Sequence, residues 1–241
     1  MPSRKSAWPQ QQATSQDKPL PCEVVLDGRV RGLRVGIPRS YFFDNLDPQV
    51  ESALIAALKT FERLGANITE IELKMAPLQR GIWSQIASPE AYSFHEEFLK
   101  SRGHLYGADV RDRIEVGRLL LSIDYVRAQR ARTLMKDECT KVFNSVDVVV
   151  TPTVPIPPPR IDQTLAKRGS VTEPIGVSLT RCTRHFNITG SPAVSLPCGF
   201  TSDGLPIGMQ IAGRAFEEAV VLRAAHAYEQ DTRWFERRCA I

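Results

Sequence analysis

These 241 residues contain few cysteines, no long apolar run and no apolar stretch near the start. The cysteines are odd in number and scattered, without a C-x-x-C pair, which is typical of free thiols in a reducing compartment. They are Cys22, Cys139, Cys182, Cys198 and Cys239. No apolar stretch approaches the roughly 18 residues of a membrane span, and the first twenty residues lack the apolar centre of a signal peptide. We therefore expect a cytoplasmic protein that does not enter a membrane.

The sequence also lacks the motifs of several ligand classes. No G-x-x-x-x-G-K-[ST] loop occurs, and no G-x-G-x-x-G leads from a strand into a helix, so no cofactor is predicted. The histidines lie far apart and FHEEF (94–98) is only half of an H-E-x-x-H motif, so no metal site is expected. The net charge is small, 31 − 27 = +4, and the densest arginines (111–132) are interleaved with acidic residues. This pattern indicates a solvated helix surface and no nucleic-acid interface.

Nucleophile motifs are equally weak. GSPAVSLPCG (190–199) does not match the G-x-S-x-G elbow of a serine nucleophile. Cys198 beside His185 is one candidate for a thiol–imidazole pair, because a neighbouring His can generate a thiolate. The alternative, a small thiol packed at the end of a strand, is favoured by the residues. No spacing of acidic residues singles out a carboxylate pair for acid–base catalysis.

The first third of the chain contains a βαβ pattern. Residues 1–21 are polar and expected to be poorly ordered, which leaves 22–241 as the folded part. LRVGIP (33–38) and NITEIEL (67–73) read as strands. Between them lies a helical stripe of apolar residues, with Asp47 as its N-cap, Pro48 at its first position and Gly65 after its end. Strand, helix and strand in this order predict parallel pairing.

The rest of the chain alternates helical and strand-like patterns. Residues 77–144 are mainly helical, with one helix opening at Ser88 and Pro89 and a longer one beginning at Asp124. Residues 158–174 are expected to form a surface loop. The other predicted elements are a buried strand at 146–150, a hairpin of two strands at 193–199 and 207–213, and a final helix at 216–230. The fold class is therefore α/β, part of a mixed β-sheet flanked by helices.

One long stretch carries a family resemblance. TRCTRHFNITGSPAVSLPCGFTSDGLPIGMQIAGRAFEEAVVLRAAHAYE (180–229) resembles the C-terminal half of the amidase signature family. LRVGIPRSYFFDNLDPQVESAL, EAYSFHEEFL, IDYVRAQRAR and VDVVVTPTVP agree with that family in order, so the resemblance runs from about residue 17 to residue 238. It implies the amidase-signature fold, hydrolysis of the C–N bond of carboxylic amides, and a small-molecule amide as substrate.

The resemblance also implies catalytic residues that this chain does not contain. Members of the family use a Ser–cis-Ser–Lys triad, in which a neutral Lys removes a proton through the bridging Ser and backbone N–H groups of a Gly/Ser-rich loop stabilise the oxyanion. The family carries this machinery in its N-terminal half. The present sequence has no adjacent Ser-Ser pair and no Gly/Ser-rich loop. We therefore expect no catalytic residue here, and a C-terminal portion that begins just after the signature region.

Three substrate-binding residues follow from the same resemblance. Thr183, Asn187 and Gly190 occupy the positions expected nearest the catalytic loop. For Asn187 the residues alone favour another interpretation, a turn residue whose side chain bonds its own backbone.

A fourth candidate is Arg113. VRDRIEVG (110–117) resembles a segment of tRNA-dependent amidotransferase A subunits that supplies an Arg for the substrate carboxylate, a group that Arg binds well in bidentate fashion. An arginine on a helix surface is the alternative. Those subunits tend to place an acid just before the Asn–Gly turn, where this chain has 179–181, Leu-Thr-Arg, which disfavours a glutamine-specific site.

Three functions stay open at this point. The chain is expected to be the C-terminal fragment of an amidase, inactive alone. Alternatively it is one half of a split amidase, or of an enzyme like the amidotransferase A subunits, completed in trans by a partner chain that carries the Gly/Ser-rich signature. The third is a non-catalytic binding protein that kept the fold.

Overall fold

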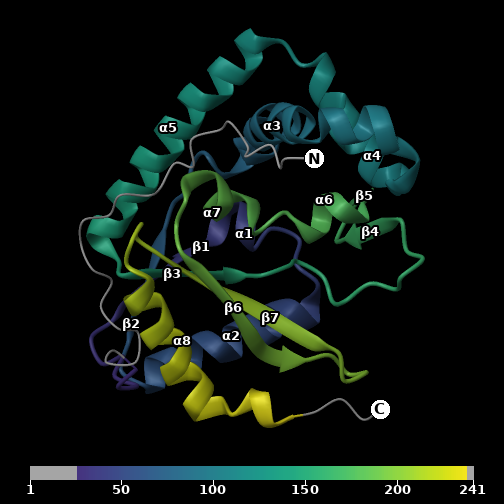
Figure 1. The fold of residues 1–241 in the computed structure, drawn as a ribbon. Coiled ribbons are helices and arrows are strands. Elements are labelled where there is room, and N and C mark those ends of the chain that lie inside the picture. The colour runs from purple at the N-terminus through teal and green to yellow at the C-terminus, as the bar shows by residue number, and fades with distance from the viewer. Residues whose placement is uncertain (1–25, 238–241) are drawn as a thin grey trace, which may run out of the picture.

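The computed structural model describes residues 26–237 (Figure 1). Their largest sheet has five strands in the order β2-β1-β3-β7-β6. These strands are β1 (Arg34–Pro38), β2 (Asn67–Ile71), β3 (Val148–Pro152), β6 (Ala193–Phe200) and β7 (Pro206–Gly213). β1 pairs in parallel with both β2 and β3, whereas β7 pairs antiparallel with β3 and β6. The predicted mixed sheet is confirmed, and the prediction for 1–21 falls outside the described residues.

Helices cover both faces of this sheet. The α-helices are α1 (Arg39–Phe42), α2 (Pro48–Arg63), α3 (Gln79–Arg102), α4 (Ala108–Glu115), α5 (Ser122–Ser145), α6 (Ile175–Leu179), α7 (Arg184–Thr189) and α8 (Glu218–Thr232). α2 and α8 lie together on one face, and α5 and α7 lie on the other (Figure 1). α3, α4 and the first half of α5 extend away from the sheet as a helical projection.

β3 shows why the sheet needs both helical layers. Val148 and Val150 belong to the core under α2 and α8, whereas Val149 belongs to the core under α5 and α7. All five residues of β3 are buried. Because alternate side chains of a strand point to opposite faces, a continuous β-branched run is stable only where both faces are covered.

α2 forms as its sequence predicts. The carboxylate of Asp47 accepts a hydrogen bond from Gln49 N at 2.9 Å, and Pro48 begins the helix. Phe61, on the buried face, stacks on Tyr228 of α8 with 5.3 Å between the ring centroids. The chain leaves the helix through Gly65, whose φ of +92° favours glycine.

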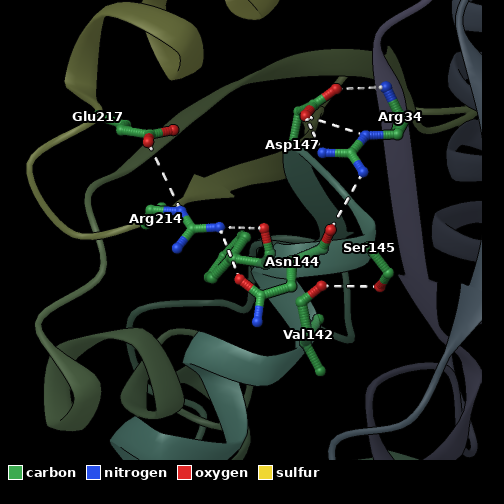
Figure 2. Close-up of polar contacts among 8 residues, drawn as sticks. Arg34, Val142, Asn144, Ser145, Asp147, Arg214 and Glu217 are labelled. Carbon is green, nitrogen blue, oxygen red and sulfur yellow. Dashed lines mark hydrogen bonds and ion pairs between the residues drawn. The ribbon is translucent and has the colours of Figure 1, made fainter.

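A network of polar contacts fixes the C-terminal end of α5 (Figure 2). Arg34 of β1 donates to the carboxylate of Asp147, at 2.6 Å from Nη2, and to the carbonyl of Asn144 at 3.2 Å. From the other side Arg214, after β7, donates to the carbonyl of Phe143 at 2.5 Å. The last carbonyls of a helix have no partner within the helix, so these two arginines satisfy two of them and tie α5 to the sheet.

One predicted helix start is wrong. The sequence predicts a helix that opens at Ser88 and Pro89, but α3 begins at Gln79 and contains Pro89 in its interior. Proline removes one helical hydrogen bond, which normally ends a helix. Here Ile82 and Ile86, on the preceding turns, are buried in a cluster with residues of α5, and this packing holds the helix together.

Residues 158–174 are also more than a loop. They contain a two-stranded antiparallel sheet of β4 (Leu165–Arg168) and β5 (Val171–Pro174). The strands are held by a buried ion pair, with Nε of Arg168 3.0 Å from Oε1 of Glu173. Among the helices of residues 26–237, none combines the length and the apolar character that a membrane crossing requires.

Candidate active site

α7 carries the three residues predicted to lie nearest the catalytic loop. Thr183 is its N-cap, Asn187 lies within it, and Gly190 is its C-cap with φ of +76°. Thr183 and Asn187 are four residues apart and so lie on the same side of the helix. Asn187 and Gly190 are exposed, whereas the residues between them are buried. The three residues thus follow one side of α7, half-buried at Thr183 and exposed at Asn187 and Gly190, and we call this side the open face of α7.

The alternative prediction for Asn187, a turn residue whose side chain bonds its own backbone, is wrong. Asn187 is helical, its N–H donates to the carbonyl of Thr183 at 3.2 Å, and no hydrogen bond of its side chain is found within residues 26–237. The turn occurs instead at Gly190, whose N–H donates to the carbonyl of Phe186 at 2.9 Å. The hairpin of β6 and β7 begins only after this point, and the predicted pairing of those strands is confirmed.

A buried polar contact from the sheet positions the start of α7. Gln210 of β7 is 4% exposed, and its Nε2 donates to the carbonyl of Cys182 at 3.2 Å. The same nitrogen donates to Oγ1 of Thr151 at 3.1 Å, at the end of β3. Because both partners are buried, the amide holds Thr183 at a defined height above the sheet.

His185 does not pair with Cys198. Its Nε2 lies 3.3 Å from Sγ of Cys139 on α5, whereas Cys198 is buried on the opposite face of the sheet, in the core under α2 and α8. Burial raises the pKa of Cys139 to about 12 and lowers the pKa of His185 to about 4. Both groups are therefore neutral near pH 7, and the contact does not generate a thiolate nucleophile.

Two cavities lie along α3, and the smaller of them reaches α7. The nearer one, of about 180 Å³, is lined by Asn187 and Ile188 together with Trp83, Ile86, Ala87, Glu90 and Arg132. The larger one, of about 810 Å³, is lined by Pro89, Glu90, Ser93, Phe94, Leu120, Leu121, Ser122 and Tyr125. Glu90 belongs to both, and its Oε1 accepts a hydrogen bond from the hydroxyl of Tyr125 at 2.9 Å. A polar contact thus marks the junction between α7 and a largely apolar groove.

Arg113 lies elsewhere. It belongs to α4, which packs against α3, and it lines neither cavity. Its side chain is 70% exposed, and Nη2 is 2.5 Å from the carboxylate of Asp109 on the same helix. The structure does not bring Arg113 together with the residues of α7.

No group of three or more His, Cys, Asp or Glu side chains in the described ranges could hold a metal ion. The site offers hydrogen-bonding groups, an apolar groove and arginines. Sequence reasoning did not single out Glu90 and Tyr125, which are 35 residues apart, although each lies in a segment that carries the family resemblance, EAYSFHEEFL and IDYVRAQRAR.

Comparisons with known proteins agree with this arrangement. A model of the amidase family, described as "Amidase", matches residues 4–222. An amidase of Pseudomonas putida is 40% identical over 225 residues, which are 92% of this chain and 48% of that protein. The glutamyl-tRNA(Gln) amidotransferase A subunit of Myxococcus xanthus is 36% identical over 96% of this chain and 52% of its own length. The chain thus spans about half the length of the curated relatives it matches.

Solved structures also match most of this chain with about half of their own length. One is an inhibitor-bound complex described as a vestigial protein complex that reveals the origins of an s-triazine catabolic enzyme. It superposes with a TM-score of 0.80 at 28% identity, over 89% of this chain and 46% of that one. The glutamyl-tRNA(Gln) amidotransferase A subunit of Thermotoga maritima has a TM-score of 0.60 at 28% identity, over 87% of this chain and 44% of its own.

Proposed function

Because this chain belongs to the amidase family, we propose that it supplies the substrate-binding side of an enzyme that hydrolyses the C–N bond of small-molecule amides. The observation that carries the proposal is the match of the family model to residues 4–222, together with 40% identity to an amidase. Thr183, Asn187 and Gly190 are the proposed substrate-binding residues, since they share one open face of α7.

The nucleophile is proposed to come from residues outside this sequence. The chain contains no Ser-Ser pair, and it matches about half of each of the two relatives above. In the proposed enzyme, that other half brings the nucleophilic Ser, the bridging Ser and the Lys to the open face of α7. It is either a further part of the same polypeptide or a partner chain.

The groove beyond Glu90 supports an apolar group on the substrate. Its walls include exposed rings and aliphatic side chains, such as Phe94 (77% exposed) and Leu121 (64% exposed). Covering such surface with an apolar group is favourable by about 25 cal/mol per Å². Asn187 and Glu90 line the same cavity, the smaller of the two. An amide bound at α7 can therefore place its apolar part in the groove beyond Glu90.

A second candidate is a component like the amidotransferase A subunits, which the identity of 36% to such proteins favours. Two features of this chain weigh against it. Arg113 is paired with Asp109 on an exposed helix, and Thr180 and Arg181 stand where an acid is expected. A simple amidase remains the preferred proposal. The cytoplasm is its proposed compartment, since Cys139, Cys182 and Cys198 are buried free thiols.

A chimera tests the proposed function. The part of the Pseudomonas putida amidase that this chain matches is replaced by this chain, and ammonia release from a panel of primary amides is measured. We expect hydrolysis by the chimera and none by this chain alone. The matched control carries Ala in place of the nucleophilic Ser in the half contributed by the relative, and it should be inactive.

The proposal is contradicted by a chimera that is folded, as its cooperative unfolding would show, but hydrolyses none of the amides. Such a result would favour a non-catalytic binding protein. Hydrolysis by this chain alone, in a preparation whose activity coelutes with it, would contradict the claim that the nucleophile comes from outside.

A further inference from the structure

Three arginines of like charge gather beside α7. Arg184 is the first residue of α7 and 8% exposed, Arg181 is partly buried one turn earlier, and Arg80 lies on α3. The Nε2 of Gln79 donates to the carbonyl of Arg181 at 2.9 Å, which fixes the start of α3 against this turn. Burial lowers the pKa of Arg184, and the charges of Arg80 and Arg181 act in the same direction, whereas Tyr41 and Glu173 act in the opposite one.

None of the three makes an ion pair with a carboxylate of residues 26–237. Arg184 donates to Oγ1 of Thr180, a neutral group. The nearby acid is Glu173, and its carboxylate already binds Arg168 at 3.0 Å. Buried charges are normally paired, so the buried guanidinium of Arg184, which has only a neutral partner, favours an anion at this site.

Unsatisfied polar atoms surround the same cluster. Nε of Arg181, Oε1 of Gln79 and Oγ of Ser178 are buried and have no hydrogen-bond partner among the described residues. Gln79 and Ser178 are both 0% exposed. Such atoms are rare in folded proteins because each one costs free energy. An anion satisfies the two donors, Nε of Arg181 and Oγ of Ser178, whereas Oε1 of Gln79 is itself an acceptor and does not bind one.

The backbone next to the cluster is strained. Tyr41 has φ of +70°, which is unusual for a bulky residue. Nη2 of Arg181 donates to its carbonyl at 2.8 Å, and the guanidinium lies 3.7 Å from the centre of its ring. Arg181 thus holds Tyr41 in this conformation and is itself held in place. Strain of this kind is typical of binding sites.

We propose that Arg80, Arg181 and Arg184 form a binding site for a carboxylate, and that this carboxylate belongs to the substrate. The inference rests on the proposed function, because Arg184 directly follows Thr183 on the helix that is proposed to face the amide. Guanidinium groups bind carboxylates through paired hydrogen bonds, and Arg80 is the member of the cluster that is exposed to solvent. The substrate class is then an amide that also carries a carboxylate. A carboxylate from an acidic side chain of the other half of the enzyme is the competing source.

The first experiment uses this chain alone and malonate as the probe. Thermal unfolding is followed in malonate and in sodium chloride of equal ionic strength. We expect a saturable rise of the melting temperature, about 3–6 °C at tenfold over the dissociation constant. Arg184→Gln should abolish the rise, and Arg29→Gln, on an 87% exposed side chain, should retain it.

A malonate response that is equal in wild type, R184Q and R29Q overturns the site. Should R184Q fail to fold, Arg80→Gln replaces it, because Arg80 is exposed and its loss should weaken the response without disturbing the core. A response of R80Q equal to that of wild type then counts against the proposal.

The second experiment distinguishes the two sources of the carboxylate in the chimera. Terminal amides with a carboxylate at the far end, two to five carbons long, are compared with the same amides ending in methyl. If the substrate supplies the carboxylate, R184Q lowers kcat/KM at least tenfold for the best carboxylated amide and leaves its methyl partner within twofold. If R184Q lowers kcat/KM equally for the carboxylated amide and its methyl partner, the substrate does not supply the carboxylate, and the site is assigned to an acid of the other half. A chimera that hydrolyses no amide contradicts the proposed function, whereas the malonate result on the chain alone still stands.

Discussion

Replacing Arg168 with Met is expected to lower the free energy of unfolding by about 3–5 kcal/mol. Arg168 is 3% exposed and Glu173 is 16% exposed, so the substitution leaves a largely buried carboxylate without its partner. It also removes the hydrogen bond from Nη1 of Arg168 to the carbonyl of Asp44 at 3.1 Å, which connects β4 to the segment after α1. Urea unfolding monitored by circular dichroism measures the change.

Two variants control this prediction. Arg160→Met breaks an ion pair with Asp162 whose side chains are 85% and 78% exposed, and it should leave the unfolding midpoint unchanged. Arg168→Met with Glu173→Leu removes both charges and should recover most of the loss, because the unpaired carboxylate is gone. If R168M alone unfolds at the wild-type urea concentration, the buried pair does not exist as described.

His185 is expected to destabilise the protein by about 3 kcal/mol as the pH falls from 6.5 to 4. Its pKa is lowered by burial from 6.5 to about 4 in the folded protein. Above pH 6.5 the imidazole is neutral in both states and contributes no pH dependence. Below it the unfolded chain binds a proton that the folded chain does not, so stability decreases until the pH reaches the folded pKa.

The comparison with His185→Phe isolates this effect. Carboxylates such as Asp231 and Glu115, whose pKa values are lowered by hydrogen bonds from Arg63 and Arg111, also lose stabilisation in acid. They remain in the variant, so the difference between the two stability–pH curves reports His185. Parallel curves for wild type and H185F between pH 4 and 6.5 would show that the buried imidazole does not have a lowered pKa.

The βαβ segment could be predicted from sequence because its signals are local. Asp47, Pro48 and Gly65 each act within one helical turn, and the predicted helix matches α2 closely. The start of α3 could not, because Pro89 is a local stop signal that the contacts of Ile82 and Ile86 with α5 override. The β4–β5 hairpin was missed because a buried Arg–Glu pair, and not an apolar alternation, holds it.

The site was predictable only in part, because contacts between residues far apart in the sequence form much of it. The resemblance indicated Thr183, Asn187 and Gly190, and the structure adds that they share one face of α7. The contact between Cys139 and His185 joins residues 46 positions apart, and no sequence pattern indicates it. The favoured prediction for Cys198, a small packed thiol, is confirmed. Contacts between distant elements leave no periodic trace in a sequence.

The central claim is that the open face of α7 borders the reacting amide, and Asn187→Ala in the chimera tests it most directly. We predict that kcat/KM falls at least about tenfold, the effect of losing one hydrogen bond of roughly 1.4 kcal/mol in the transition state, with an unchanged melting temperature. Asn67→Ala, at the exposed edge strand β2, should keep full activity. An N187A chimera that hydrolyses amides at the rate of its parent would contradict the claim.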